Sequence, residues 1–164
     1  AFLAHPTLRS RRGVVVARRV VPPQFVSEQG GIRFAGVGYA AVELAATDDG
    51  RAICECLRRR LADIAGLNLA LAALSGADGQ AARRKVVAEC STNPWSYAEL
   101  RLHRILLAAG ITGWVANRPI EVGGSIVRPD VRFGDKRLVL EFDGRDVHAV
   151  HSRRPAGAAR TLIR

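Results

Sequence analysis

Residues 96–110 read SYAELRLHRILLAAG, and residues 126–144 read IVRPDVRFGDKRLVLEFDG. The first stretch predicts a helix, because Ser96 and Glu99 have the spacing of a capping box and Gly110 suits the position just after a helix end. Its apolar residues recur at helical spacing, whereas those of the second stretch recur at the spacing of two that is typical of strands. The chain is therefore expected to place a helix directly before a set of strands.

Three strands are expected after this helix, over residues 115–122, 126–133 and 137–143. Gly123-Gly124 predicts a hairpin turn between the first two, and residues 134–136 predict a turn between the second and the third. Because short turns join antiparallel neighbours, these strands should form a meander. With the helices expected elsewhere, the predicted fold class is α/β or α+β.

Three acidic residues fall on the last two of these strands. Glu141 and Asp143 are two positions apart, so they share one face of their strand. With a turn centred near Asp135, antiparallel pairing brings Asp130 close to Glu141. Carboxylates this close repel one another unless a cation lies between them, and oxygen ligands suit Mg²⁺ or Mn²⁺. A metal held there could activate water for phosphodiester hydrolysis. The other interpretation is an exposed acidic strand face.

The residues before position 93 predict a mixed lead-in region. Short extended pieces are expected before residue 36, among them Val14–Val16 and Val20–Val21, and Gly30-Gly31 marks a turn. Helices are expected over residues 39–46, 51–65, 67–74 and 80–90. The domain organisation predicted from these segments is a lead-in region over 1–92, a compact core over 93–148 and an irregular basic tail over 149–164.

The charge of the chain favours a polyanionic partner. Lys and Arg number 25 against 15 for Asp and Glu, which gives a net charge of +10. Such a surplus suits DNA, because each neutralised phosphate releases a condensed counterion. The alternative is a basic protein from an Arg-rich proteome. The runs at residues 58–60 and 83–85 are expected to be solvated basic helix faces, or one stripe that binds nucleic acid.

Other sequence features bear on the location of the protein. No run of 18 apolar residues occurs, so no membrane span is expected. The three cysteines lack the spacing of a disulfide framework, which predicts a reducing, cytoplasmic location. Cys54, Cys56 and Cys90 are expected to be small core residues.

The order of the acidic residues resembles that of the PD-(D/E)XK nuclease superfamily. Glu99 on a helix, then Pro129-Asp130, then Glu141-Phe142-Asp143-Gly144 and His148 is most similar to very-short-patch-repair-like endonuclease domains of actinobacterial proteins. This resemblance covers residues 95–148. Residues 14–90 resemble, more loosely, the AbiEi-type antitoxin segments found beside such domains.

The resemblance implies a metal-dependent DNA endonuclease that uses Mg²⁺ or Mn²⁺. It implies that Asp130 and Glu141 are metal ligands, and that Asp143 is a third ligand or positions the attacking water. It further implies that Glu99 reaches the metal through water and that His148 is a general acid/base or binds phosphate. The cations nearest to this set are candidates for DNA phosphate contacts, and they are Arg128, Arg132 and Arg145.

Two departures from the pattern favour alternatives. Asp143 stands where the superfamily has a Lys, and after His148 the chain reads AVHSRRPAGAARTLIR in place of a basic helix, a strand and a final helix. We expect the sheet to lack an edge strand and catalysis to be impaired or absent. The chain would then be a non-catalytic DNA-binding or antitoxin-like regulatory module, or a product without activity. Capping alone also explains Glu99.

Overall fold

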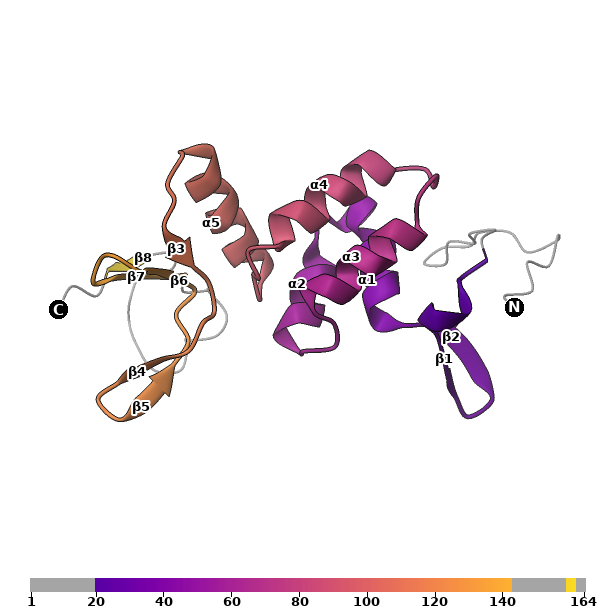
Figure 1. The fold of residues 1–164 in the computed structure, drawn as a ribbon, viewed down its shortest axis with the longest axis horizontal. Coiled ribbons are helices and arrows are strands. Elements are labelled where there is room, and N and C mark those ends of the chain that lie inside the picture. Colours follow the sequence, from indigo (N-terminus) through magenta and orange to yellow (C-terminus); the bar gives the residue numbers. More distant parts are fainter. Residues whose placement is uncertain (1–19, 143–158, 162–164) are drawn as a thin grey trace, which may run out of the picture.

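The protein is an α+β fold, as predicted, in which a group of helices is joined to a small antiparallel sheet (Figure 1). The computed structural model describes residues 20–142 and 159–161. The helical elements are η1 (Pro23–Phe25), α1 (Val37–Asp48), α2 (Arg51–Arg58), α3 (Ile64–Ala73), α4 (Gln80–Cys90) and α5 (Tyr97–Ala108). The strands are β1 (Val26–Gln29), β2 (Ile32–Ala35), β3 (Trp114–Val115), β4 (Ile120–Val122), β5 (Ser125–Val127), β6 (Val131–Phe133), β7 (Leu138–Phe142) and β8 (Ala159–Thr161).

Helices α1 to α4 enclose the larger core, called here the helical core. Fully buried side chains such as Val42, Ile53 and Leu67 come from successive helices and pack together. The three cysteines belong to this core, as predicted. Burial raises the pKa of the Cys56 thiol, so this side chain is a small packing group and not a reactive thiolate.

A short hairpin of β1 and β2 precedes the helices. Gly30 and Gly31 form its turn with φ values of 58° and 74°, a conformation that glycine adopts without strain. The predicted turn is confirmed, and β1 and β2 are extended pieces in the region where such pieces were expected, whereas Val20–Val21 is not a strand. Val14–Val16 lies outside the described residues.

The predicted helix over residues 51–65 is wrong in its extent, because the chain leaves the helix after Arg58. Leu61 N–H donates to Cys56 O at 2.9 Å and Arg60 N–H donates to Leu57 O at 3.1 Å, which is the pattern of a Schellman motif. Arg60 takes the left-handed position of this motif, with a φ of 56°. Asp63 then caps α3 by accepting a hydrogen bond from Gly66 N at 2.7 Å.

Replacing Arg60 by glycine is expected to raise the free energy of unfolding by about 1 kcal/mol, because a side chain in left-handed backbone costs about that much. Urea denaturation measures this difference. The matched control is Gly110→Ala, since Gly110 ends α5 in the same motif with a φ of 67°. That control should lower stability by about 1 kcal/mol, and an unchanged or lower stability of Arg60→Gly would contradict the expectation.

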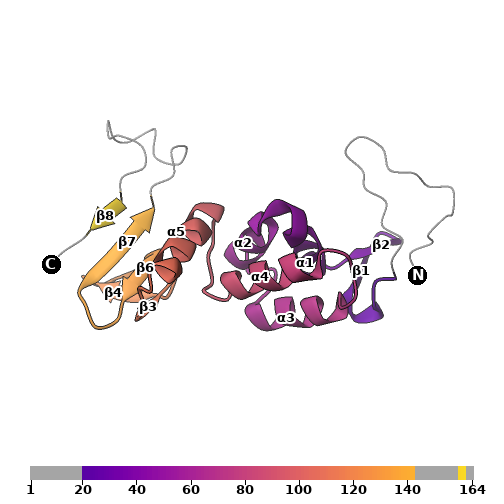
Figure 2. The same ribbon diagram turned by 90° about the horizontal axis from the view of Figure 1, so that it is seen from above.

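Helix α5 is the element that both cores share. Its cap is the one predicted, since the Ser96 hydroxyl accepts from Glu99 N at 3.1 Å. Leu100 lies in the helical core, and Leu106 packs on Val131 and Phe133 in a second, smaller core under the sheet. Figures 1 and 2 show α5 lying against the sheet while α1 to α4 gather on its other side.

An ionic cluster ties α5 to the helices before it. The Arg104 guanidinium donates to Asp49 Oδ1 at 2.8 Å and to Glu89 Oε2 at 2.6 Å. Tyr97 also donates to the Asp49 carboxylate, at 2.7 Å. The hydrogen bonds from Arg104 and, to a smaller extent, from Tyr97 lower the pKa of Asp49 to about 2. These contacts fix the orientation of α5 relative to α4 and to the end of α1.

The sheet has the strand order β3-β6-β7-β8, with β4 and β5 forming a separate hairpin. Two predicted strands are therefore each divided, because residues 115–122 contain Asn117 in the left-handed region and residues 126–133 contain Pro129. The turns at Gly123-Gly124 and at residues 134–136 are as predicted. Ala159–Thr161, within the segment expected to be irregular, pairs with β7 as β8, so the sheet has a strand where none was expected.

Candidate functional site

The register of β6 and β7 brings two of the predicted site residues together. Val131 pairs with Leu140 and Arg132 pairs with Val139. The next position in this antiparallel register sets Asp130 opposite Glu141, and residues directly opposite each other have Cβ atoms about 5 Å apart. Since Val131 and Leu140 belong to the core under α5, Asp130 and Glu141 lie toward the other face of the sheet. The register of β6 and β7 is therefore the one that the predicted closeness of Asp130 and Glu141 requires.

The Asp130 carboxylate has a defined orientation at the end of β7. Its Oδ2 atom accepts a hydrogen bond from Phe142 N at 2.7 Å. This bond turns the carboxylate toward the β7 backbone at Phe142. Asp130 is half-buried, as is Glu141, so both carboxylates have limited contact with water.

A cavity of about 910 Å³ lies on this side of the sheet, called here the sheet cavity. The β4–β5 hairpin supplies one wall, through Ile120 and Val127, and Glu141 lines the floor. Cations from β6 and the β6–β7 turn also line it, and they are Arg132, Lys136 and Arg137. Two further carboxylates, Glu121 and Asp135, line the cavity as well. Carboxylates beside cations on a concave surface suit the binding of a phosphate chain together with a metal ion.

The residues present fit a hard divalent cation only in part. Asp130 and Glu141 supply carboxylate oxygens of the kind that Mg²⁺ and Mn²⁺ prefer. Within residues 20–142, no group of three or more His, Cys, Asp or Glu side chains is arranged to hold a metal. Asp143, the predicted third ligand, lies outside the described residues, as do His148 and Arg145.

Glu99 lies in a different environment from Asp130 and Glu141. It is only 7% exposed, and its Oε2 atom accepts from Trp95 N at 2.9 Å and from Asn117 Nδ2 at 2.7 Å. Asn117 in turn donates its backbone N–H to Pro129 O at 3.0 Å, next to Asp130. Glu99 thus fastens the start of α5 to the loops of the sheet, a role that fits the capping interpretation.

The predicted phosphate-binding arginines do not gather at one place. Arg132 lines the sheet cavity, and its buried Nε atom has no hydrogen-bond partner in the described part of the chain. Arg128 instead lines a second cavity, of about 630 Å³, between the helices and the sheet. Of the expected basic face at residues 83–85, Arg83 is not on the surface, because it is 5% exposed and donates to Glu43 O at 3.2 Å.

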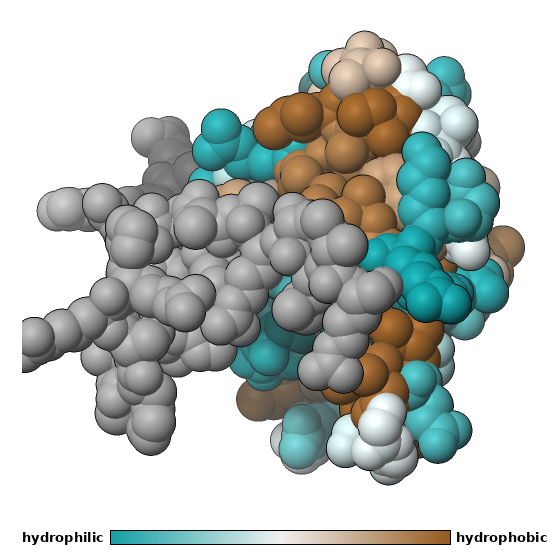
Figure 3. Space-filling view, turned by 90° about the vertical axis from the view of Figure 1, so that its left-hand side faces the viewer, coloured by the Kyte–Doolittle hydropathy of each residue, from teal (hydrophilic) through white to brown (hydrophobic). Residues whose placement is uncertain are grey.

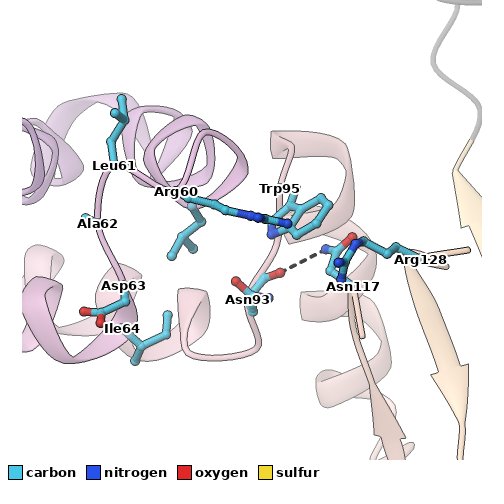
Figure 4. Close-up of a pocket in the computed structure, with 10 residues that line it drawn as sticks. Arg60, Leu61, Ala62, Asp63, Ile64, Asn93, Trp95, Asn117 and Arg128 are labelled. Atoms are coloured by element: carbon cyan, nitrogen blue, oxygen red, sulfur yellow. Dashed lines mark hydrogen bonds between the residues drawn. The ribbon is translucent and has the colours of Figure 1, made fainter. Parts of the chain in front are cut away.

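The second cavity, called here the junction cavity, contains residues that sequence reasoning missed. Arg60 and Trp95 line it together with Asn117 and Arg128 (Figure 4). Arg60 comes from the connection between α2 and α3, and Trp95 from the linker before α5. No sequence pattern predicted their proximity, since residues 60, 95, 117 and 128 are separated by whole helices and strands. The one sequence feature that drew attention to this part of the chain was the run of three arginines at residues 58–60.

His103, on α5, lines neither of these two cavities. It is fully buried, its Nδ1 atom is 2.8 Å from Thr92 Oγ1, and its ring lies 4.8 Å from that of Trp114. Burial lowers the pKa of His103 to about 4, against a smaller opposing effect of the Asp130 backbone. The ring is therefore neutral at physiological pH and serves as a packing group behind β6.

Apolar surface interrupts the charged surface at the sheet end of the molecule (Figure 3). Ile105 on α5 is 63% exposed, and Ile126 on the β4–β5 hairpin is 74% exposed. Among the described residues, cationic side chains therefore do not cover this end continuously, and the concave sites described above are the better candidates for binding an anion.

None of the helices in the described ranges combines the length and apolar character that crossing a membrane requires. In comparisons with protein-family models, curated proteins and solved structures, nothing matches this chain.

Proposed function

We propose that the chain is a metal-dependent nuclease that hydrolyses phosphodiester bonds of DNA at the sheet cavity. The observation that carries this proposal is the cross-strand placement of Asp130 opposite Glu141 beside a cavity lined by both cations and carboxylates. Two half-buried carboxylates at this separation offer a divalent cation the oxygen ligands that it prefers.

The carboxylate pair and the cations of the cavity have separate parts in this proposal. Asp130 and Glu141 would hold the metal, and Asp143, which lies outside the described residues, is the proposed third donor. A metal bound there supplies an activated water and stabilises the leaving oxyanion. Arg132, Lys136 and Arg137 would bind the phosphates that flank the cleaved bond. The hydrogen bond from Phe142 N keeps the Asp130 carboxylate oriented before any metal binds.

The second candidate function is DNA binding without cleavage. It is favoured by the presence of only two converging carboxylates among residues 20–142. Asp143 in place of the superfamily's Lys supports it as well. In that case Arg132, Lys136 and Arg137 of the sheet cavity would bind the phosphate backbone and no metal would be required.

Plasmid nicking in the presence of Mg²⁺ or Mn²⁺ distinguishes the two functions. Asp130→Asn should reduce nicking and Mg²⁺ affinity by about tenfold or more, because it removes one ligand charge. Asparagine keeps an oxygen that can accept from Phe142 N, so the fold should be preserved. Glu141→Gln should act in the same way.

Asp135→Asn is the matched control, because Asp135 lines the same cavity from the β6–β7 turn but lies away from the carboxylate pair. It should leave nicking unchanged. DNA binding in EDTA without nicking in either metal would support the non-catalytic module and reject the nuclease proposal. Equal loss in Asp135→Asn would show that general charge, and not the pair, is responsible.

A further inference from the structure

The junction cavity is built from segments that are far apart in the sequence. The connection between α2 and α3 forms one wall, and the loops that flank β4 and β5 form the opposite wall. Trp95, in the linker before α5, lies between them (Figure 4). The junction cavity has a volume of about 630 Å³, which falls within the range of small-molecule sites.

Two cations reach into this cavity without a carboxylate partner. In Figure 4, Arg60 extends toward Trp95 from the helical wall, and Arg128 extends toward Asn117 from the opposite wall. Among the described residues, neither arginine forms an ion pair, unlike Arg58 and Arg59, which are both bound to Glu55. The carboxylate nearest in the lining, Asp63, is engaged in capping α3. The cavity is therefore suited to an anion.

The rest of the lining favours an anion that carries a flat aromatic group. Trp95 offers a half-buried indole on which a base can stack, since base–aromatic stacking does not depend on which base is present. Leu57 and Ile64 supply apolar contact, and the amides of Asn93 and Asn117 lie at the other end. A nucleotide combines a planar base with a phosphate, so it matches both the indole and the guanidinium groups.

The backbone is unusual at the same place. Four non-glycine residues of the described chain have a positive φ, and three of them, Arg60, Asn93 and Asn117, line this cavity. Asparagine tolerates this conformation, but arginine does so at a cost. Gly110 fills the equivalent position at the end of α5. An arginine in a backbone conformation where glycine would be more stable points to a role in binding.

We propose that the junction cavity binds one nucleotide unit, with the base on Trp95 and the phosphate between Arg60 and Arg128. The unit could be a free nucleotide or one nucleotide of a single-stranded nucleic acid, because both present the same chemistry. This site is separate from the carboxylate pair, and the proposal does not depend on nuclease activity.

The test is a titration of the full chain in EDTA, followed by tryptophan fluorescence. The probes are deoxyadenosine monophosphate, adenosine and a single-stranded oligodeoxyadenylate. Stacking on Trp95 should quench the emission with the monophosphate or the oligonucleotide, and much less with adenosine. Quenching by the monophosphate assigns a free-nucleotide site, and quenching by the oligonucleotide alone assigns a nucleic-acid site.

Variants of the two arginines provide the decisive comparison. Arg60→Gly and Arg128→Gln should each weaken binding by about tenfold, since each removes a charge-assisted contact with phosphate. Arg60→Gly should do so while its thermal midpoint rises, which excludes unfolding as the cause. Trp95→Phe should abolish the quenching signal.

Two controls separate this site from others. Arg59→Gln changes a neighbouring arginine that is bound to Glu55 and does not line the cavity, so it should leave affinity unchanged. Asp130→Asn should leave it unchanged as well, which keeps this result independent of the proposed nuclease. No quenching with any probe, or affinities of Arg60→Gly and Arg128→Gln within twofold of the native chain, would overturn the proposal.

Discussion

Lowering the pH from 6.5 to 4 is expected to reduce the free energy of unfolding by about 3 kcal/mol through His103 alone. In the unfolded chain this histidine binds a proton below pH 6.5, whereas in the folded chain burial delays protonation until about pH 4. The unfolded state therefore binds more protons between these two values. Stability contributed by the neutral ring is fully present above pH 6.5 and is lost as the pH falls toward 4.

Urea unfolding at several pH values between neutral and 4 measures this effect. The His103→Gln variant should lose most of the slope over that interval, whatever its stability at neutral pH. Asp49 contributes little to the slope over this interval, because its pKa is 3.8 in the unfolded chain and about 2 in the folded one, so its contribution to stability is lost mainly below pH 4. A slope that is the same in the native chain and in His103→Gln would contradict the assignment.

The Glu99→Ala substitution is expected to lower the free energy of unfolding by about 3 kcal/mol. It would leave Trp95 N–H without its acceptor and would break the bond to Asn117 Nδ2 that joins α5 to the sheet loops. Both groups lie where water has little access, so the lost hydrogen bonds would not be replaced in full. Denaturant unfolding of the purified variant gives the value.

Glu99→Gln is the matched control, because both donors bind the same oxygen, Oε2, and glutamine retains one such oxygen. We expect it to stay within about 1 kcal/mol of the native chain. It also separates the two interpretations of Glu99. A stable Glu99→Gln variant that loses nicking would assign Glu99 to catalysis, whereas unchanged nicking would leave it the structural role that its contacts describe.

Local signals explain which elements could be predicted from the sequence. The limits of α4 and the cap of α5 depend on residues adjacent in the chain, so Ser96, Glu99 and Gly110 were sufficient to predict α5. The end of α2 was missed because Arg60 occupies a position where glycine is usual, and the helical spacing of apolar residues continues past it. Asp63 caps α3, but it lies inside the longer helix that was predicted over residues 51–65, so it was not recognised as a capping residue.

The same distinction holds for the candidate sites. The closeness of Asp130 and Glu141 followed from one short turn, so counting residues from Asp135 was enough. The junction cavity depends on how the helices pack against the sheet loops, which no local pattern encodes. Arg83 illustrates the same limit, because it looks like a surface cation in the sequence and is buried by its contacts with α1 and the α3–α4 connection.

Helix α5 carries Leu100 and Leu106 less than two turns apart, yet each belongs to a different core. Cutting the chain in the linker before α5 would remove α1 to α4, which cover Leu100, and would expose this apolar side of α5 to water. The helical core and the sheet thus share α5, and we expect a fragment that begins at this linker to be less stable than the same segment in the full chain.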